Sequence, residues 1–184
     1  MKSSELNKPR KTSSFKKLWS IHWIMSASYL LLYTAGITMN RIPRDIFIRS
    51  YLFDFHKSMG ALVMALLTWR IFLLLQIYTK KYRRKKPKLS LDWFRNSALH
   101  TFLYMLMFIV PTSGFFLSNS VRNNNVSFLG IVLPDIFPEN RAIVGLASSV
   151  HFWLAYGFLA LIVLHIINQE KFVKSFWRRN ISQS

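Results

Sequence analysis

Four long apolar stretches, separated by polar and charged segments, constrain the fold of this chain more than any other feature. They cover approximately residues 19–39, 54–78, 97–118 and 147–169. A helix of about 20 residues crosses the hydrocarbon core of a bilayer, so each stretch is long enough to span a membrane. Hydrophobic residues make up 52% of the chain and charged residues 17%, and the two kinds are segregated along it. The sequence therefore predicts an all-α integral membrane protein built as a four-helix bundle.

The distribution of Lys and Arg predicts how the bundle is oriented. Six precede the first apolar stretch, eight lie between the second and third, and four follow the last. The two connections on the opposite side hold only five. Positively charged segments stay on the cytoplasmic side, so we expect both termini and the loop at 80–88 in the cytoplasm. The expected location is the cytoplasmic (inner) membrane, with another energy-transducing membrane as the alternative.

The net charge of +18 does not require a nucleic-acid partner. In a soluble protein such a charge would favour binding to a phosphate backbone. Here the basic residues flank membrane spans, where they act as topology signals and contact anionic lipid headgroups. We therefore expect membrane lipids as partners and no nucleic acid.

Three segments are expected along the chain. Residues 1–17 form a basic cytoplasmic N-terminal extension, 18–172 the transmembrane domain and 173–184 a cytoplasmic C-terminal tail. The first apolar stretch is too long for a removable signal peptide, and no small-residue cleavage site follows it. The loop at 119–146 contains the apolar segment 128–134, which is expected either to lie at the membrane interface as a lid or to pack as a structured loop.

Histidine is the only side chain here that can be expected to hold a metal or haem. The chain has no cysteine, which excludes disulfides, zinc-thiolate and iron-sulfur sites and the covalent attachment of c-type haem. All five histidines fall inside the predicted spans, where polar side chains are costly and usually serve a function. They are His22, His56, His100, His151 and His165.

The spacing of the histidines predicts two sites, one near each side of the membrane. His151 and His165 are 14 residues apart, which puts them on one helix face about 21 Å apart along the axis. The alternating direction of the helices pairs His22 with His165 on the cytoplasmic side and His56 with His151 on the other. Paired imidazoles are suitable axial ligands for six-coordinate haem iron, whose natural chemistry is electron transfer. We therefore predict two non-covalent b haems with these four ligands.

Four further residues are candidates for haem contacts. Gly36 and Gly60 are expected to leave room beside a haem ring, since Gly36 follows His22 by 14 residues and Gly60 follows His56 by one turn. Arg70 would bind a haem propionate, or would instead extend to the lipid headgroups. His100 could replace a ligand, contact a propionate or take part in quinone protonation. No residue is assigned a catalytic role.

The sequence resembles the bacterial cytochrome b561 family, which is related to the cytochrome b subunits of nickel-iron hydrogenases. The motifs are residues 21–23 (Ile-His-Trp), 56–60 (His-Lys-Ser-Met-Gly) followed by Arg70, His100 followed by Pro111 and Gly114, the loop at 128–134, and His151 with His165. The resemblance implies a four-helix bundle with two b haems on the same four histidines, and exchange of electrons with quinone. Some relatives are similar to quinone-linked superoxide oxidases, and others anchor a dehydrogenase or hydrogenase.

Two departures from the family pattern limit what the resemblance implies. Some relatives carry further histidines two turns after the last ligand, whereas residues 168–172 of this chain contain none. The basic N-terminal extension is also unusual, and it serves either a cytoplasmic partner or topology control.

Three functions stay in view after the sequence analysis. The leading hypothesis is a quinone-coupled electron-transfer protein, with quinone or quinol as substrate and a redox partner protein or small oxidant on one side. The alternative is a haem-bearing anchor subunit of a hydrogenase or dehydrogenase. The third is a haem-free scaffold or ion carrier that uses its histidines for packing or metal. The sequence does not decide whether the chain is itself an enzyme, in which direction electrons flow, where quinone binds or what the oligomeric state is.

Overall fold

Four long helices account for most of the structure, a computed structural model that describes residues 13–82 and 90–169. The helices are α1 (Ser13–Arg41), α2 (Ile48–Tyr82), α3 (Leu91–Val121) and α4 (Val144–Asn168). A short 3-10 helix, η1 (Arg141–Ile143), precedes α4. The all-α bundle predicted from the sequence is confirmed. The extension up to residue 12, the loop from residue 83 to 88 and the tail at 173–184 lie outside the described residues.

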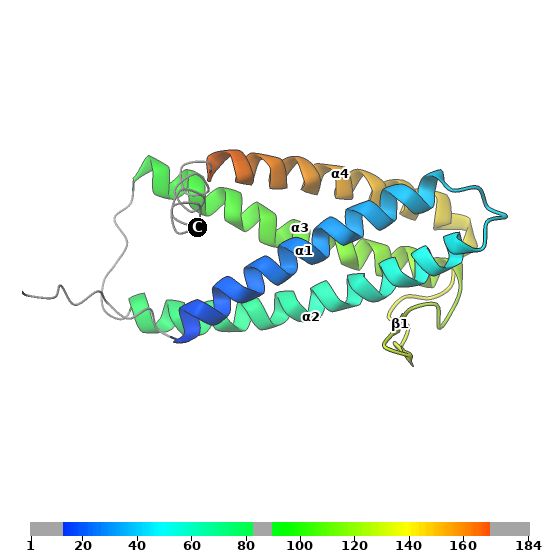
Figure 1. Ribbon diagram of the computed structural model, residues 1–184, viewed down its shortest axis with the longest axis horizontal. Helices are drawn as coiled ribbons and strands as arrows, with labels where there is room; N and C mark the ends of the chain where they lie inside the picture. Colours follow the sequence, from blue (N-terminus) through cyan, green and yellow to red (C-terminus); the bar gives the residue numbers. More distant parts are fainter. Residues whose placement is uncertain (1–12, 83–89, 170–184) are drawn as a thin grey trace, which may run out of the picture.

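The helices run further than the predicted spans because a helix continues past the hydrocarbon core into polar surroundings. In α2, for example, the helix begins at Ile48 rather than Asp54 and continues to Tyr82. Figure 1 shows the four helices running along the length of the molecule, with the connection between α1 and α2 and the β hairpin at the same end. We call the end with the β hairpin and η1 the loop side, and the opposite end, where α1 begins and α4 ends, the tail side.

Three of the four helices are long and apolar enough to cross a membrane. They cover Ile48–Thr79, Trp93–Val121 and Arg141–Asn168. The helix α1 has 29 residues but is less apolar, because it carries several hydroxyl residues in addition to His22. The hydroxyls of Ser26, Ser28 and Thr34 donate to the carbonyl four residues earlier, so this helix satisfies its own polar groups.

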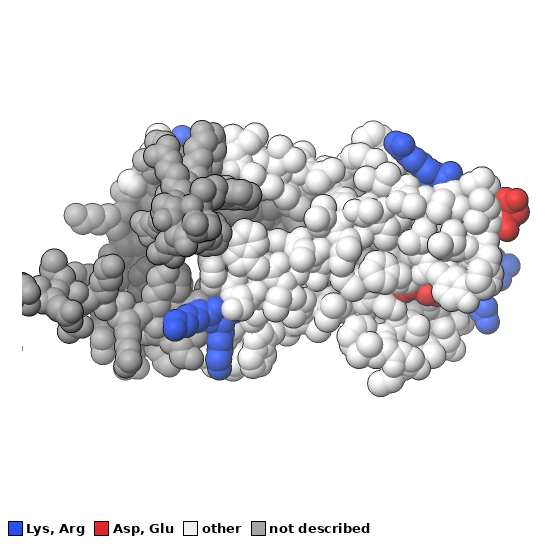
Figure 2. All heavy atoms as spheres, in the orientation of Figure 1, with Lys and Arg blue, Asp and Glu red and all other residues white. Residues whose placement is uncertain are grey.

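The surface between the two ends of the bundle is suited to lipid. On the face in Figure 2, the Lys, Arg, Asp and Glu side chains lie toward the two ends, and the area between them is uncharged. Large apolar side chains of every long helix are exposed. Examples are Leu30, Leu75, Phe102 and Trp153. An exposed apolar surface of this extent is stable in lipid rather than in water.

The bundle is made of two packed helix pairs. Helix α1 packs on α2, α3 packs on α4, and α2 also contacts α3. Within the described residues, no Cα atom of α1 lies within 8 Å of one in α4. Long side chains bridge this interval: the Tyr33 hydroxyl donates to the Ala155 carbonyl at 2.8 Å, and the rings of Tyr29 and Phe158 lie 5.1 Å apart. The interior therefore lies between the two helix pairs.

Pro111 interrupts the hydrogen bonding of α3 at this interior. Proline has no N–H, so the Met107 carbonyl has no helical partner four residues later. The Tyr29 hydroxyl of α1 lies 3.4 Å from that carbonyl and donates to it. The break in one helix thus becomes a contact between the two helix pairs.

The loop between α3 and α4 is ordered by buried polar contacts. Strands β1 (Ser127–Phe128) and β2 (Ile131–Val132) pair in antiparallel fashion, and Gly130 adopts a φ of 82° in the turn. The Ser58 hydroxyl of α2 donates to the Ser127 carbonyl at 2.7 Å, which holds the hairpin beside α2 (Figure 1). Fully buried Asn119 donates to Asp135 and accepts from the Ile136 and Phe137 N–H groups. The predicted apolar segment is thus a hairpin packed on the bundle, with Leu129 at its tip 84% exposed.

Candidate functional site

Four of the five histidines lie in two facing pairs. On the loop side, the ring centroids of His56 and His151 are 6.3 Å apart and the ring planes are at 88°. On the tail side, the corresponding values for His22 and His165 are 6.4 Å and 80°. His56 lies on α2 and His22 on α1, whereas His151 and His165 both lie on α4. Each histidine pair thus bridges the interval between the two helix pairs. The structure thus brings together the histidines that helix direction and spacing had paired.

A glycine on α1 positions His56. The Nδ1–H of His56 donates to the Leu32 carbonyl at 3.1 Å, and Gly36 lies one turn after Leu32. A Cβ atom at Gly36 would lie 3.3 Å from the Cε1 of His56, which is tighter than usual. The missing side chain therefore lets the imidazole approach the backbone carbonyl. With the proton on Nδ1, the lone pair is on Nε2.

The same arrangement occurs on α3 for His151. Its Nδ1–H lies 3.1 Å from the Val110 carbonyl and 2.9 Å from the Ser113 hydroxyl oxygen. Gly114 lies one turn after Val110, and a Cβ atom there would lie only 2.9 Å from the Cε1 of His151. We call this arrangement, a carbonyl exposed to an imidazole by a glycine one turn later, a glycine gap. Both histidines of the loop-side pair have one.

The tail-side pair has different surroundings. The Nδ1 of His165 is buried and has no hydrogen-bond partner. The ring of His100 lies 5.1 Å from that of His165, at 87°. His100 itself donates from Nδ1 to the Asn96 carbonyl of its own helix at 2.7 Å. Three histidines therefore gather at this end, whereas two face each other at the loop side.

Arg70 is directed into the bundle at the tail-side half. Its Nε donates to the Tyr104 hydroxyl of α3 at 2.7 Å, and its guanidinium carbon lies 5.8 Å from the Tyr104 ring centroid. One terminal nitrogen, Nη1, is buried with no hydrogen-bond partner. Among the described residues, Arg70 has no carboxylate partner. A partly buried guanidinium in this state is suited to an anionic group, because it still has donors to offer.

The other predicted contact, Gly60, differs from Gly36. A Cβ atom at Gly60 would meet no atom within 4 Å, so space is open beside it. At Gly36 the space is filled by the edge of His56. Sequence reasoning gave no role to Ser113 or Tyr104 and quoted Gly114 only as part of a motif. No local pattern identifies them, because each acts through a residue on another helix.

The geometry of the two pairs fits a metal held between imidazoles. A metal–imidazole bond of about 2 Å on each side places the ring centroids about 6 Å apart. The two facing pairs, at 6.3 and 6.4 Å, meet this condition. The rings of His100 and His165 meet at a similar angle, but their separation of 5.1 Å is too short for a metal between them. In the described part of the chain, no group of three or more His, Cys, Asp or Glu side chains could hold a bare metal ion. A site with two protein ligands suits a haem iron, because the porphyrin supplies the other ligands.

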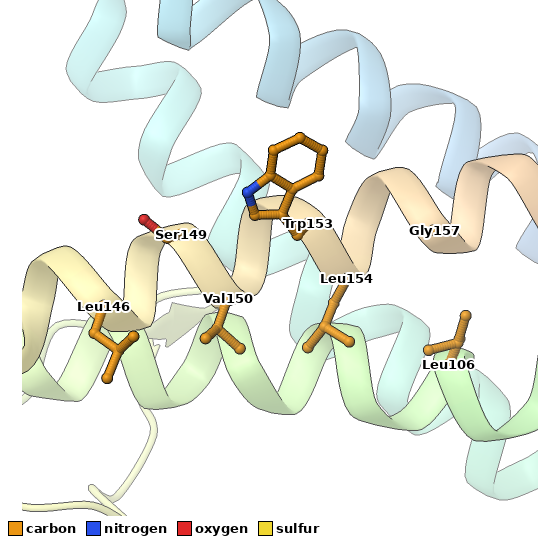
Figure 3. Close-up of a pocket in the computed structure, with 7 residues that line it drawn as sticks. All are labelled: Leu106, Leu146, Ser149, Val150, Trp153, Leu154 and Gly157. Atoms are coloured by element: carbon orange, nitrogen blue, oxygen red, sulfur yellow. The ribbon is translucent and has the colours of Figure 1, made fainter.

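A shallow groove of about 610 Å³ lies between α3 and α4 and is almost wholly apolar. Leu146, Val150 and Leu154 of α4 point toward α3, whereas Trp153 points away (Figure 3). The complete lining is Leu106, Leu146, Ser149, Val150, Trp153, Leu154 and Gly157. With no ionisable group in its lining, this groove suits hydrocarbon chains.

Comparison with known proteins identifies one family. A family model described as prokaryotic cytochrome b561 matches residues 17–181, which includes all four helices except the first residues of α1. No curated protein matches the chain significantly.

Proposed function

Because the chain belongs to the prokaryotic cytochrome b561 family, we propose that it relays electrons between two b haems and exchanges them with the quinone pool of the bacterial inner membrane. Membership of the family makes the chain a membrane-bound b-type cytochrome, and so an electron-transfer protein. The number of haems, their ligands and the use of quinone are the parts that we propose.

The observation that supports two sites is the pair of matched imidazole separations, 6.3 Å and 6.4 Å. His56 and His151 would hold one haem at the loop side, and His22 and His165 the other at the tail side. Haem would supply reversible one-electron chemistry, and each pair of imidazoles would provide its two protein ligands. An iron held in this way would have no ligand position for oxygen, which would favour electron transfer over oxygen binding.

The remaining candidate residues have roles that follow from their contacts. Arg70 would bind a propionate of the tail-side haem with its unpartnered Nη1, while Tyr104 holds its Nε. Gly60 would leave room beside the loop-side haem, since nothing lies near its Cα–Cβ direction. His100 would support His165 by edge-on ring contact rather than bind iron.

The proposed electron carrier follows from the location of the chain. The exposed apolar surface of the long helices contacts lipid, in which quinone is dissolved. With the irons fully ligated, a carrier would exchange electrons at a haem edge rather than at the metal. Oxidation of superoxide with quinone as acceptor would use the same relay. Superoxide would donate its electron at one end of the bundle, and quinone would accept an electron at the other.

The decisive experiment is to purify the chain in detergent, measure haem per chain and record a reduced-minus-oxidised spectrum before and after adding quinol. We expect two low-spin b haems per chain, both reduced by quinol. Two haems that quinol fails to reduce, unless a partner enzyme is added, would replace the proposal with the role of anchor subunit. A colourless protein from haem-replete cells would overturn it and favour a haem-free scaffold.

A further inference from the structure

The two histidine pairs differ in what their Nδ1 atoms contact. On the loop side, His56 and His151 both donate to a main-chain carbonyl at 3.1 Å, through a glycine gap. On the tail side, the Nδ1 of His165 has no partner at all, although it is buried. The two glycine gaps lie on different helices, α1 and α3, so the loop-side arrangement arises twice independently.

Such hydrogen bonds change the character of an imidazole ligand. When Nδ1–H donates to a carbonyl, electron density shifts to the opposite nitrogen and the ligand becomes more basic. A more basic axial ligand stabilises ferric iron relative to ferrous iron, so it lowers the reduction potential. Two such ligands on one haem act in the same direction.

The nearby charges also differ between the two sites. Lys57, beside His56 in sequence, pairs with Asp54 at 2.9 Å and donates to Asn125 at 2.8 and 3.1 Å. Its charge is therefore balanced by protein groups. Arg70 has no carboxylate partner among the described residues and hence offers an unbalanced positive charge on the tail side. A positive charge favours the reduced state of a nearby haem, which carries one more electron.

We infer that Gly36 and Gly114 are positioning residues that, by exposing the Leu32 and Val110 carbonyls to His56 and His151, make the loop-side haem the harder of the two to reduce. This inference rests on the proposed two-haem function. Its consequence is a direction: one electron passes more favourably from the loop side to the tail side, and no bond forms or breaks in that step. The end with the β hairpin is then the donor side.

The test is a redox titration of the purified holoprotein, followed by its visible spectrum, in wild type and in Gly36→Ala and Gly114→Ala variants. The component that His56→Ala removes identifies the loop-side haem. We expect this component to titrate at the lower potential in wild type. In both glycine variants the added Cβ pushes the imidazole from its carbonyl, so the component should move toward the higher potential. A neutral hydrogen bond is worth from a few-fold to about tenfold in an equilibrium constant, so we expect a shift of that size in the reduction equilibrium of the loop-side haem.

Two further variants separate this effect from general damage. Gly145→Ala adds a Cβ in open space and should leave both components unchanged. Ser113→Ala removes the hydroxyl 2.9 Å from the Nδ1 of His151 without adding volume, and should shift the loop-side component in the same direction, though less. This variant keeps the test decisive if Gly114→Ala loses its haem.

Electron paramagnetic resonance of the oxidised protein gives a readout independent of any activity. The low-spin signal of the loop-side haem should change in the glycine variants, and the tail-side signal should not. A loop-side haem that titrates at the higher potential, or glycine and Ser113 variants that leave it unmoved, would overturn the inference. Fewer than two haems per chain in wild type would instead overturn the proposed function.

Discussion

The histidine rings show how single residues distinguish two sites built from the same side chain. His165 has two ring neighbours, at 6.4 Å (His22) and 5.1 Å (His100), and only the longer separation leaves space for a metal between the rings. His56 and His151 have only each other within this range among the described aromatic contacts. A pair of histidines that could hold a metal is therefore recognised by a ring separation near 6 Å, and two rings that lie closer than this do not qualify.

This distinction predicts the effects of histidine substitutions. His56→Ala and His151→Ala should each remove the loop-side haem and leave the other, whereas His22→Ala and His165→Ala should each remove the tail-side haem. His100→Ala should retain both, because the ring of His100 is too close to that of His165, at 5.1 Å, for an iron to lie between them. Haem content and low-temperature spectra of the purified variants measure this. Loss of different haems from the His56 and His151 variants would refute the pairing.

Arg70 leads to a prediction about potential rather than occupancy. In Arg70→Gln, the loss of a partly buried positive charge should lower the potential of the tail-side haem, because the reduced state loses more stabilisation than the oxidised one. Two unit charges about 10 Å apart at an effective dielectric constant of about 20 interact by about 1.7 kcal/mol, so removing such a charge is expected to change the reduction equilibrium by roughly tenfold.

The matched control for Arg70→Gln is Arg141→Gln. Arg141 is largely exposed beside Glu139, so its loss should change neither haem. Redox titration of both variants provides the measurement. An Arg70 that extended to the headgroups would also leave both potentials unchanged, and that result would exclude a propionate contact.

At the scale of helices, a seven-residue repeat aligns the two sites with an aromatic layer between them. Tyr29 follows His22 by seven residues, and Phe158 lies seven residues from both His151 and His165. The rings of Tyr29 and Phe158 meet edge to face at 5.1 Å, and Phe158 is only 2% exposed. The layer fills the bundle midway between the sites and excludes water there.

The aromatic layer predicts where the bundle is most sensitive. Phe158→Ala should destabilise the protein by about 3–5 kcal/mol, because a buried aromatic ring would be replaced by a cavity. Phe152→Ala, on the same helix but 41% exposed, should cost much less. Thermal unfolding in detergent, followed by loss of the haem absorbance band, compares the two. Equal losses would show that Phe158 is not part of the packed interior.

How much was predictable from the sequence also differs by element. The four helices followed from apolar length, and the facing of histidines followed from helix direction and 14-residue spacing. The glycine gaps did not, because which carbonyl an imidazole meets depends on how α1 and α3 are rotated against their neighbours. The Arg70–Tyr104 contact and the burial of Asn119 under the loop have the same cause. The ligand roles of the histidines stay predictions until haem is measured.

At the scale of the whole molecule, charge and hydropathy determine how the bundle lies in a membrane. Eighteen Lys and Arg residues of the sequence lie on the tail side of the predicted spans and five on the loop side. The positive-inside rule then predicts a cytoplasmic tail side and an external loop side. The donor side inferred from the glycine gaps would thus face outward.

Reporter fusions test this orientation. Alkaline phosphatase, which is active only outside the cytoplasm, should be active when fused after Asn124 in the third loop and inactive when fused after Ser184. Green fluorescent protein at the same two positions should give the opposite pattern and serves as the control. Activity of phosphatase at Ser184 would reverse the orientation, and with it the outward position of the loop-side haem.

The separation of α1 from α4 has a consequence for biogenesis. Each helix pair is already packed within itself, so α1 with α2 and α3 with α4 can enter the bilayer one after the other as finished hairpins. The interval between α1 and α4 is crossed by side chains, among them Tyr33, which donates to the Ala155 carbonyl, and Tyr29, which meets Phe158. A haem dissolved in the bilayer would then enter between α1 and α4 after translation has ended, without separating the helices of either pair. Maturation of this protein would then depend on the supply of cofactor within the membrane and not on its presence at the ribosome.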